Sequence, residues 1–162
     1  MQEFLTTDRL LFREINETDT ADIVKWRSDE DVYKFFKYPH RITVEEHVSW
    51  FNNNYKNNNS RTDYICIEKS SGKKIGVFGL IHNGMDCEIN YLLSPEAKHK
   101  GYAQEALKFF VQYAHSNFNS KRIMAEIHKD NMPSINLINR IGFQIESEEG
   151  SFIVYSMILE DS

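Results

Sequence analysis

The sequence predicts an α/β (α+β) domain, in which a mixed, mostly antiparallel central sheet of about seven strands is flanked by about four helices. Three observations indicate this class. Strand and helix patterns follow one another in the order β-α-α-β-β-β-α-β-α-β-β. Three consecutive strand patterns in the middle of the chain are typical of an antiparallel meander. The 162 residues contain no internal repeat or linker-like stretch, which indicates one domain over residues 1–162.

The N-terminal part predicts a strand and a helix. Residues 9–15 have a strand pattern. Asn16 is a suitable N-cap for a helix that runs to about Arg27. Residues 28–42 contain many aromatic side chains and predict irregular structure.

A second helix is predicted after Thr43, because Thr43 and Glu46 have the spacing of a capping box. Apolar residues then recur with helical spacing, at positions 44, 48, 51 and 55. The polar residues 52–60 predict a frayed helix end followed by a loop.

The meander is predicted from three strands and two turns. The strand patterns cover residues 64–67, 74–81 and 88–93. Ser70–Lys73 and His82–Met85 each contain a glycine at a turn signal, the second within an Asn-Gly pair that favours a tight hairpin.

The C-terminal part predicts two helices and three strands. Residues 101–118 form an amphipathic helix pattern. Asn131 and Gly142 are residue types that begin and end a short helix, with a proline in its first turn. The strands are predicted at residues 122–128, 143–146 and 152–159.

The composition argues against several classes of function. Lys and Arg total 19 against 24 Asp and Glu, and this net charge of −5 is unlike the basic footprint of a nucleic-acid-binding protein. Cys66 and Cys87 match no zinc spacing, the six histidines form no metal motif, and we assign no metal. The longest apolar run, Ile75–Ile81, is much shorter than the ~20 residues of a membrane span, and no signal-peptide pattern is visible. We expect a cytoplasmic protein, a monomer or homodimer, without nucleic-acid or membrane partners.

One stretch has a ligand-binding pattern. The strand end at Tyr91–Leu93 leads through a loop with Lys98 and Lys100 into a helix that begins with Gly101 and Ala103. Small residues let the backbone approach a ligand, and the free N–H groups and dipole of a helix start favour a phosphate or pyrophosphate. The pattern is neither a P-loop nor a dinucleotide-binding fingerprint. By itself it fits a close-packed helix start equally well.

Two motifs in the expected order resemble the GNAT N-acetyltransferases. Lys98-x-x-Gly101-x-Ala103 resembles motif A of that family, whose first residue is usually Arg or Gln. Asn131-x-x-Ser134-x-x-Leu137-x-x-Arg140-Ile-Gly142-Phe143 resembles the next motif. The N-terminal segment Thr7–Arg13 resembles the RimJ/RimL-type branch. The resemblance covers essentially the whole chain and implies the GNAT fold.

The resemblance implies acetyl-CoA as the co-substrate. Backbone amides of the loop would hold the pyrophosphate, and the strand end would lie beside the pantetheine arm. The N–H of Leu93 would polarise the thioester carbonyl, which is oxyanion stabilisation. Asn131 also suits plain helix capping. The implied cofactor-binding residues are Tyr91, Leu92, Leu93, Lys98, His99, Lys100, Gly101, Tyr102, Ala103, Asn131 and Asn136.

The implied reaction is direct attack of a primary amine on the thioester in a ternary complex. The amine must be neutral, so a carboxylate near the thioester, acting directly or through water, is expected as the base. We prefer Glu88 to Glu126 for this role. The alternative is that Glu88 is merely a polar residue on a half-exposed strand. A covalent route is less favoured, because Cys66 and Cys87 lie in strand patterns without a neighbouring histidine.

The residue that should donate a proton to the leaving thiolate differs from the family pattern. Many GNAT enzymes place a tyrosine in the second motif, where this chain has Ile138. Ser134, one turn earlier, is the expected substitute, and the alternative is a plain first-turn serine. Tyr91, Tyr102 and water remain open as donors.

Residues 26–51 combine aromatic and basic side chains, which suits stacking on a base or sugar and pairing with phosphate. Core packing of the aromatics is the alternative. The segment resembles PseH-type enzymes, which acetylate the 4-amino group of a UDP-linked amino sugar. This resemblance implies that Arg27 and His47 contact the acceptor. Trp26 and Tyr91 are also expected to bind the substrate.

The preferred acceptor is therefore the amino group of a nucleotide-linked amino sugar. A protein N-terminus, a polyamine and another small amine remain open. A non-catalytic acyl-CoA-binding module is the alternative from a different class.

Overall fold

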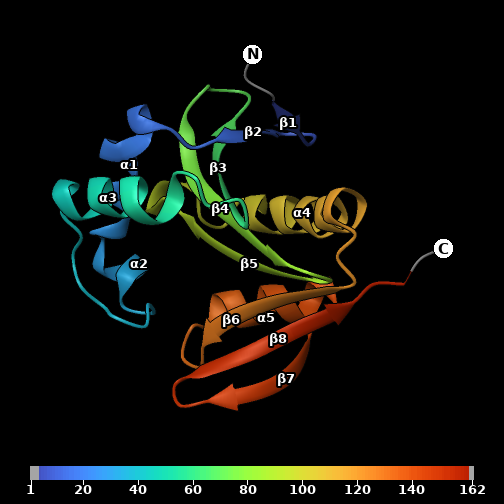
Figure 1. Cartoon of the computed structure of the whole chain (residues 1–162). Helices are drawn as coiled ribbons and strands as arrows, with labels where there is room; N and C mark the ends of the chain where they lie inside the picture. Colours follow the sequence, from blue (N-terminus) through green and yellow to red (C-terminus); the bar gives the residue numbers. More distant parts are fainter. Residues whose placement is uncertain (1–3, 161–162) are drawn as a thin grey trace.

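The computed structural model describes residues 4–160 and contains an eight-stranded sheet in the order β1-β2-β3-β4-β5-β6-β8-β7 (Figure 1). Neighbouring strands are antiparallel except β5 and β6, which are parallel. The strands are β1 (Leu5–Thr6), β2 (Leu10–Glu14), β3 (Arg61–Glu68), β4 (Lys74–Asn83), β5 (Asp86–Leu93), β6 (Arg122–His128), β7 (Gln144–Glu149) and β8 (Phe152–Ile158).

Helices cover both faces of this sheet (Figure 1). Strand alternation separates two cores: Phe78 of β4 packs with Phe110, whereas its neighbour Val77 packs with Ile23 and Tyr55 on the other face. The helices are α1 (Thr20–Arg27), α2 (Glu30–Tyr33), α3 (Val44–Trp50), α4 (Tyr102–Phe118) and α5 (Met132–Ile141), with the 3₁₀ turns η1 (Glu17–Asp19) and η3 (Pro95–Ala97) and the π-helical turn η2 (Phe51–Tyr55). Within residues 4–160, none of these helices has the length and apolarity needed to cross a bilayer.

The two halves of the sheet separate between β5 and β6. Their parallel ladder joins only Asp86–Glu88 to Arg122–Met124, although β5 continues to Leu93 and β6 to His128. Figure 1 shows the two strands diverging beyond this ladder. The end of β5 is therefore unlike an ordinary inner strand, because its backbone groups have no ladder partner on β6 beyond Glu88.

Local signals predicted most helix boundaries correctly. Capping boxes are present at Asn16 and at Thr43, and the Asn131 side chain accepts a hydrogen bond at the start of α5. Gly142 ends α5 with φ 115°, a left-handed conformation that favours glycine. The strand at 122–128 is confirmed, and the other strands and helices of the meander and the C-terminal part lie close to their predicted bounds.

The structure corrects the sequence interpretation in the N-terminal part. The two-residue strand β1 and the four-residue helix α2 were not predicted, because elements this short have no periodic pattern. Residues 51–55 continue α3 as a π-helical turn where we predicted fraying. Val44 and Val48 are 49% and 41% exposed, so they do not form the buried stripe that their spacing predicts. Tyr55, the last member of the predicted stripe, is buried, and His47 is the buried residue of α3.

Candidate active site

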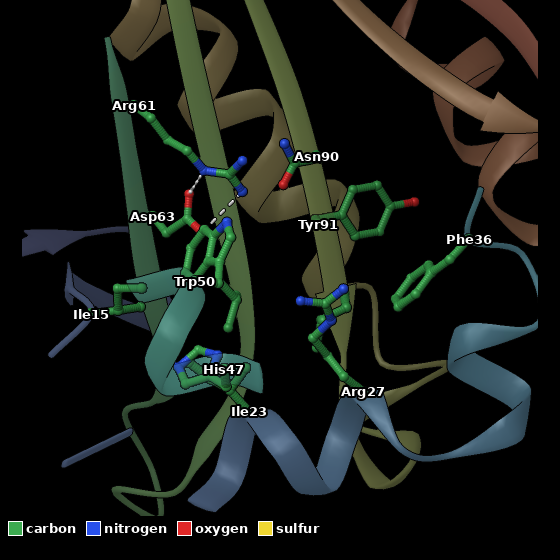
Figure 2. Close-up of a pocket in the computed structure, with 12 residues that line it drawn as sticks. Ile15, Ile23, Arg27, Phe36, His47, Trp50, Arg61, Asp63, Asn90 and Tyr91 are labelled. Carbon is green, nitrogen blue, oxygen red and sulfur yellow. Dashed lines mark hydrogen bonds and ion pairs between the residues drawn. The ribbon is translucent and has the colours of Figure 1, made fainter. Parts of the chain in front are cut away.

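A cavity of about 310 Å³ opens on the sheet face that carries α1 and α3 (Figure 2). Its walls come from the residue after β2, α1, the segment after α2, α3, the start of β3, β4 and the last part of β5. The wall is polar and aromatic as well as apolar, which is typical of a site for a small molecule. The lining residues are Ile15, Ile23, Arg27, Phe36, His47, Trp50, Arg61, Asp63, Val77, Asn90, Tyr91 and Leu92.

Arg27 supplies a partly buried positive charge to the cavity. Its guanidinium lies 5.2 Å from the centre of the Phe36 ring, and no carboxylate within residues 4–160 forms an ion pair with it. Burial lowers the pKa of Arg27, and the nearby Arg61 lowers it further. A cation in this position is costly without an anion, so the cavity is suited to a ligand that brings one.

His47 is buried beside Arg27 and is 2% exposed. Its Nδ1 atom has no hydrogen-bond partner in the described part of the chain. Burial lowers the pKa of His47, and Arg27 adds to this, so the imidazole is neutral near pH 7. A neutral ring with a free nitrogen can accept or donate one hydrogen bond to a bound molecule.

Arg61 and Asp63 form a paired unit on the opposite wall of the cavity. Arg61 Nε donates to Asp63 Oδ1 over 2.9 Å, and Nη2 donates to Oδ2 over 3.2 Å. The Arg61 guanidinium also lies 5.1 Å from the Trp50 ring centre (Figure 2). Asp63 thus has Arg61 as its hydrogen-bonding partner, and its charge and that of Glu46 only partly offset the lowering of the Arg27 pKa by burial and by Arg61.

Gly79 leaves the space in which two of these side chains meet. Asp63, Gly79 and Asn90 lie opposite one another in register on β3, β4 and β5. A Cβ atom at Gly79 would lie 2.7 Å from Asp63 Oδ1 and 2.6 Å from Asn90 Oδ1. Only glycine therefore allows both polar side chains to face the cavity here.

Tyr91 connects this cavity to α5. Its hydroxyl lies 2.7 Å from the hydroxyl of Ser134, and its ring stacks on Phe78 at 5.5 Å. Burial raises the pKa of Tyr91, although the bond to Ser134 acts in the opposite direction. The structure thus brings two expected proton donors into contact. Ile138 is 1% exposed and packs in the core.

Glu88 lies beside the cavity but does not line it. It occupies the same face of β5 as Asn90 and Leu92. Burial raises the pKa of Glu88, the Glu126 charge raises it further, and Lys37 lowers it. Lys37 Nζ lies 2.8 Å from Glu126 Oε1. The two candidate bases are therefore electrostatically coupled.

The loop before α4 contains two residues in the left-handed conformation. His99 and Gly101 have φ values of 66° and 79°, and Gly101 is the N-cap of α4 without a side-chain cap. The side chains of Lys98, His99 and Lys100 are exposed. The Tyr102 side chain is not free for a cofactor, because it is buried and its hydroxyl donates to Glu68 Oε2 over 2.5 Å.

The remaining predicted site residues have different surroundings. Trp26 does not lie on the cavity wall, because it is 5% exposed and packs in the core with Ile23 and Tyr55. Leu92 lines the cavity, whereas Leu93 packs toward the α4 side of the sheet. The Asn131 side chain accepts a hydrogen bond from the backbone N–H of Ser134, and Asn136 is exposed on α5. No group of three His, Cys, Asp or Glu side chains within residues 4–160 could hold a metal ion.

Phe36 and Trp50 belong to the aromatic and basic segment 26–51 that the sequence analysis assigned to the acceptor, but Arg61, Asp63 and Asn90 were missed as members of this site. No local motif marks these three residues, because they come from two different strands. The predicted strand at 64–67 did not include Arg61 and Asp63, and only the strand register aligns Asp63 with Asn90 across Gly79.

Comparison with known proteins gives a consistent result. Residues 9–144 match the model of the acetyltransferase (GNAT) domain. The chain is 31% identical over 144 residues to the uncharacterized N-acetyltransferase YnaD of Bacillus subtilis, covering 88% of this chain and 83% of YnaD. It is 27% identical over 152 residues to the acetyltransferase PseH of Campylobacter jejuni, covering 93% and 92%.

A solved structure has the same fold. Spermidine N-acetyltransferase from Vibrio cholerae, in complex with CoA and spermine, superposes with a TM-score of 0.82 at 17% identity. The superposition covers 94% of this chain and 96% of that chain.

Proposed function

The chain belongs to the GNAT family and is an acetyl-CoA-dependent N-acetyltransferase, and on this premise we propose that it acetylates the amino group of a nucleotide-linked amino sugar. The observation that carries this proposal is Arg27 in the cavity wall, which forms no ion pair with a carboxylate of residues 4–160, beside His47, whose Nδ1 atom has no hydrogen-bond partner there. The PseH relative, with coverage above nine-tenths of both chains, supports the same class of acceptor.

The charges of the cavity favour an anionic acceptor. Phosphate oxygens form short, charge-assisted hydrogen bonds with guanidinium groups, and among the described residues no carboxylate forms an ion pair with Arg27. The free Nδ1 of His47 offers one more hydrogen bond. Phe36 and Trp50 present ring surface to a base or sugar.

The loop before α4 supports the binding of acetyl-CoA, which supplies the thioester to be attacked. We propose that the amides from Lys98 to Ala103 hold its pyrophosphate, because positive φ at His99 and Gly101 exposes consecutive N–H groups at a helix start. Leu93, at the end of β5 beyond the ladder with β6, would offer its N–H to the thioester carbonyl.

We assign the proton transfers to Glu88 on one side and to Tyr91 with Ser134 on the other. Glu88 would take the amine proton through water, since it neighbours the cavity without lining it. Tyr91 or Ser134 would protonate the departing thiolate. A cysteine nucleophile is disfavoured, because burial raises the pKa of Cys66 to about 12 and that of Cys87 to about 11.

A polyamine acceptor fits the cavity less well, although a spermidine N-acetyltransferase shares the fold. A polycation needs free carboxylates, whereas Asp63, the carboxylate among the lining residues, is held by Arg61. Arg27 would repel such a ligand.

The test is release of free thiol from acetyl-CoA across three acceptor classes: UDP-linked 4-amino sugars, peptides with varied N-termini, and spermidine. We expect turnover with the amino sugar and competitive inhibition by UDP. Turnover with peptides or spermidine alone would overturn the proposed acceptor. Failure of the purified chain to bind CoA in calorimetry would overturn the proposed cofactor site.

A further inference from the structure

The N-terminal segment Thr7–Arg13, which carries the branch resemblance, contacts the start of α4. Thr7 Oγ1 donates to Glu105 Oε2 over 2.5 Å, and the backbone N–H of Arg9 donates to the same oxygen over 2.9 Å. Arg9 Nε donates to Glu105 Oε1 over 2.7 Å. Glu105 lies in the first turn of α4, so these bonds tie the turn between β1 and β2 to the beginning of this helix.

Arg9 also holds the loop itself. Its Nη1 atom donates to the backbone carbonyl of Lys100 over 2.8 Å. Its guanidinium lies 4.5 Å from the centre of the Tyr102 ring, and its Nη2 atom is 3.4 Å from where a Cβ of Gly101 would lie. One side chain thus contacts Lys100 and Tyr102, the residues on either side of Gly101, where the loop becomes a helix.

The loop needs an external support of this kind. His99 has a φ of 66°, a left-handed conformation that is unfavourable for a residue other than glycine. Gly101 is left-handed as well, and it provides no side-chain cap. Without contacts from outside, such a segment would sample other conformations, and a ligand held by its amides would have to order it on binding.

We propose that Arg9 is a positioning residue for the CoA pyrophosphate site, and that it acts by fixing Lys100 and Glu105 in the geometry that presents the loop amides. This inference rests on the proposed function, in which the amides from Lys98 to Ala103 bind the pyrophosphate. An arginine is required because its planar fork reaches the carboxylate and the carbonyl at once, which a lysine ammonium on its flexible stem does not do.

A variant that removes the charge of Glu105 distinguishes positioning by Arg9 from a simple effect of its charge. If Arg9 acted only through its positive charge, removal of the Glu105 charge would strengthen the binding of an anion nearby. If Arg9 acts by positioning, Glu105→Gln weakens binding, because the Arg9 side chain loses its charged partner. The two explanations therefore predict changes of opposite sign for one variant.

The experiment is isothermal titration calorimetry of CoA with the full chain. We expect Arg9→Ala and Arg9→Lys each to raise the Kd for CoA about tenfold, which corresponds to about 1.4 kcal/mol. Glu105→Gln should raise it several-fold. In steady-state kinetics the KM for acetyl-CoA should rise, with kcat and the acceptor KM unchanged.

Arg122→Ala is the matched control. Arg122 is also a partly exposed arginine with two carboxylate partners, Asp86 at 2.9 Å and Glu146 at 2.6 Å, but it lies at the start of β6. It should keep the wild-type Kd for CoA. If Arg9→Ala fails to fold, as circular dichroism would reveal, Arg9→Lys and Glu105→Gln carry the test.

Wild-type CoA affinity in Arg9→Lys, or tighter binding in Glu105→Gln, would overturn the positioning role. A lower Tm in Arg9→Ala with an unchanged Kd would overturn it as well, since the contacts would then serve stability alone. Absence of CoA binding in the wild-type chain would instead overturn the proposed function, so the two failures are distinguishable.

Discussion

The hydroxyl groups of Tyr91 and Ser134 lie 2.7 Å apart, and this contact joins β5 to the first turn of α5. The residues are separated by 43 positions in the sequence, and they meet beyond the point where β5 and β6 stop pairing. Each hydroxyl can donate and accept, so the pair can pass a proton from one oxygen to the other. Ile138 occupies the position where many family members have tyrosine. Its buried side chain has no hydroxyl and cannot donate a proton.

We expect Tyr91→Phe and Ser134→Ala each to lower kcat by about a hundredfold, the usual loss for a general acid, while the Kd for CoA changes little. Because the two hydroxyls act as one unit, the double variant should be no slower than the slower single variant. Steady-state kinetics measure kcat, and calorimetry measures the Kd.

Tyr113→Phe is the matched control for the tyrosine. Its hydroxyl lies 3.4 Å from that of Tyr64, and Tyr113 does not line the cavity, so kcat should stay at the wild-type value. Wild-type kcat in both Tyr91→Phe and Ser134→Ala would exclude this pair from the reaction.

Glu88 should set the acidic limb of the pH profile. Burial and then Glu126 raise the pKa of Glu88, so its base form is lost at a higher pH than for an ordinary carboxylate as pH falls. Glu126→Gln removes one of these causes and leaves Lys37 in place, so the acidic limb of kcat/KM should move to lower pH. Lys37→Ala should move it to higher pH, because Lys37 lowers the pKa of Glu88.

The measurement is kcat/KM as a function of pH for the wild type, Glu126→Gln and Lys37→Ala. Glu88→Gln is the variant that should lose the acidic limb. Shifts of the limb in the same direction for Glu126→Gln and Lys37→Ala would contradict the electrostatic coupling. An unchanged limb in Glu88→Gln would assign it to another group.

Arg27→Ala should separate acceptor binding from stability. We expect the KM for an anionic acceptor to rise at least about tenfold, since one charge-assisted contact is lost. The Tm should not fall, because no protein carboxylate in the described chain loses an ion-pair partner and the cost of burying the charge is removed.

Lys25→Ala makes the same change of charge at an exposed site on α1, so its acceptor KM should equal that of the wild type. An acceptor KM that is equally insensitive to Arg27→Ala would count against an anion in this part of the cavity.

Arg13→Ala, unlike Arg27→Ala, should lower the stability of the protein, because Arg13 is a buried arginine that is paired with a carboxylate. Its Nη1 and Nη2 atoms donate to Asp19 over 2.8 and 2.7 Å, and Asp19 is fully buried. Removing Arg13 leaves this carboxylate with Lys74 at 2.7 Å as its remaining ion-pair partner among the described residues. We expect a loss of about 3 kcal/mol in the free energy of unfolding, measured by urea denaturation.

The same pair predicts a pH dependence of stability. Burial alone would raise the pKa of Asp19, but hydrogen bonds from Arg13 and Lys74 outweigh burial and lower it. A carboxyl group with a lowered folded-state pKa stabilises the protein fully above its unfolded pKa of about 3.9 and loses this contribution as pH falls through the folded value. Arg13→Ala should therefore flatten the fall in unfolding free energy below about pH 4. An equally steep fall would assign the acid sensitivity to other carboxylates.

Much of the fold could be predicted because its signals are local. The caps at Asn16, Thr43 and Asn131 and the left-handed Gly142 lie within a few residues of the helices they delimit. Strand alternation indicated the meander in the same way. Residues 98–103 are contiguous, so their loop and helix start could be recognised before any tertiary contact was known.

The sequence by itself thus determined the order of the longer elements, the caps and the helix start at Gly101, since each depends on interactions within one turn or one strand. Tertiary structure alone decided which side chains share the site. Trp26 and Arg27 are adjacent, yet packing of α1 places Trp26 in the core and Arg27 on the cavity wall. Asp63 and Asn90 meet only through strand register, and Tyr91 meets Ser134 only because α5 packs beside the end of β5. Contacts between elements depend on register and packing angles, which no local pattern encodes.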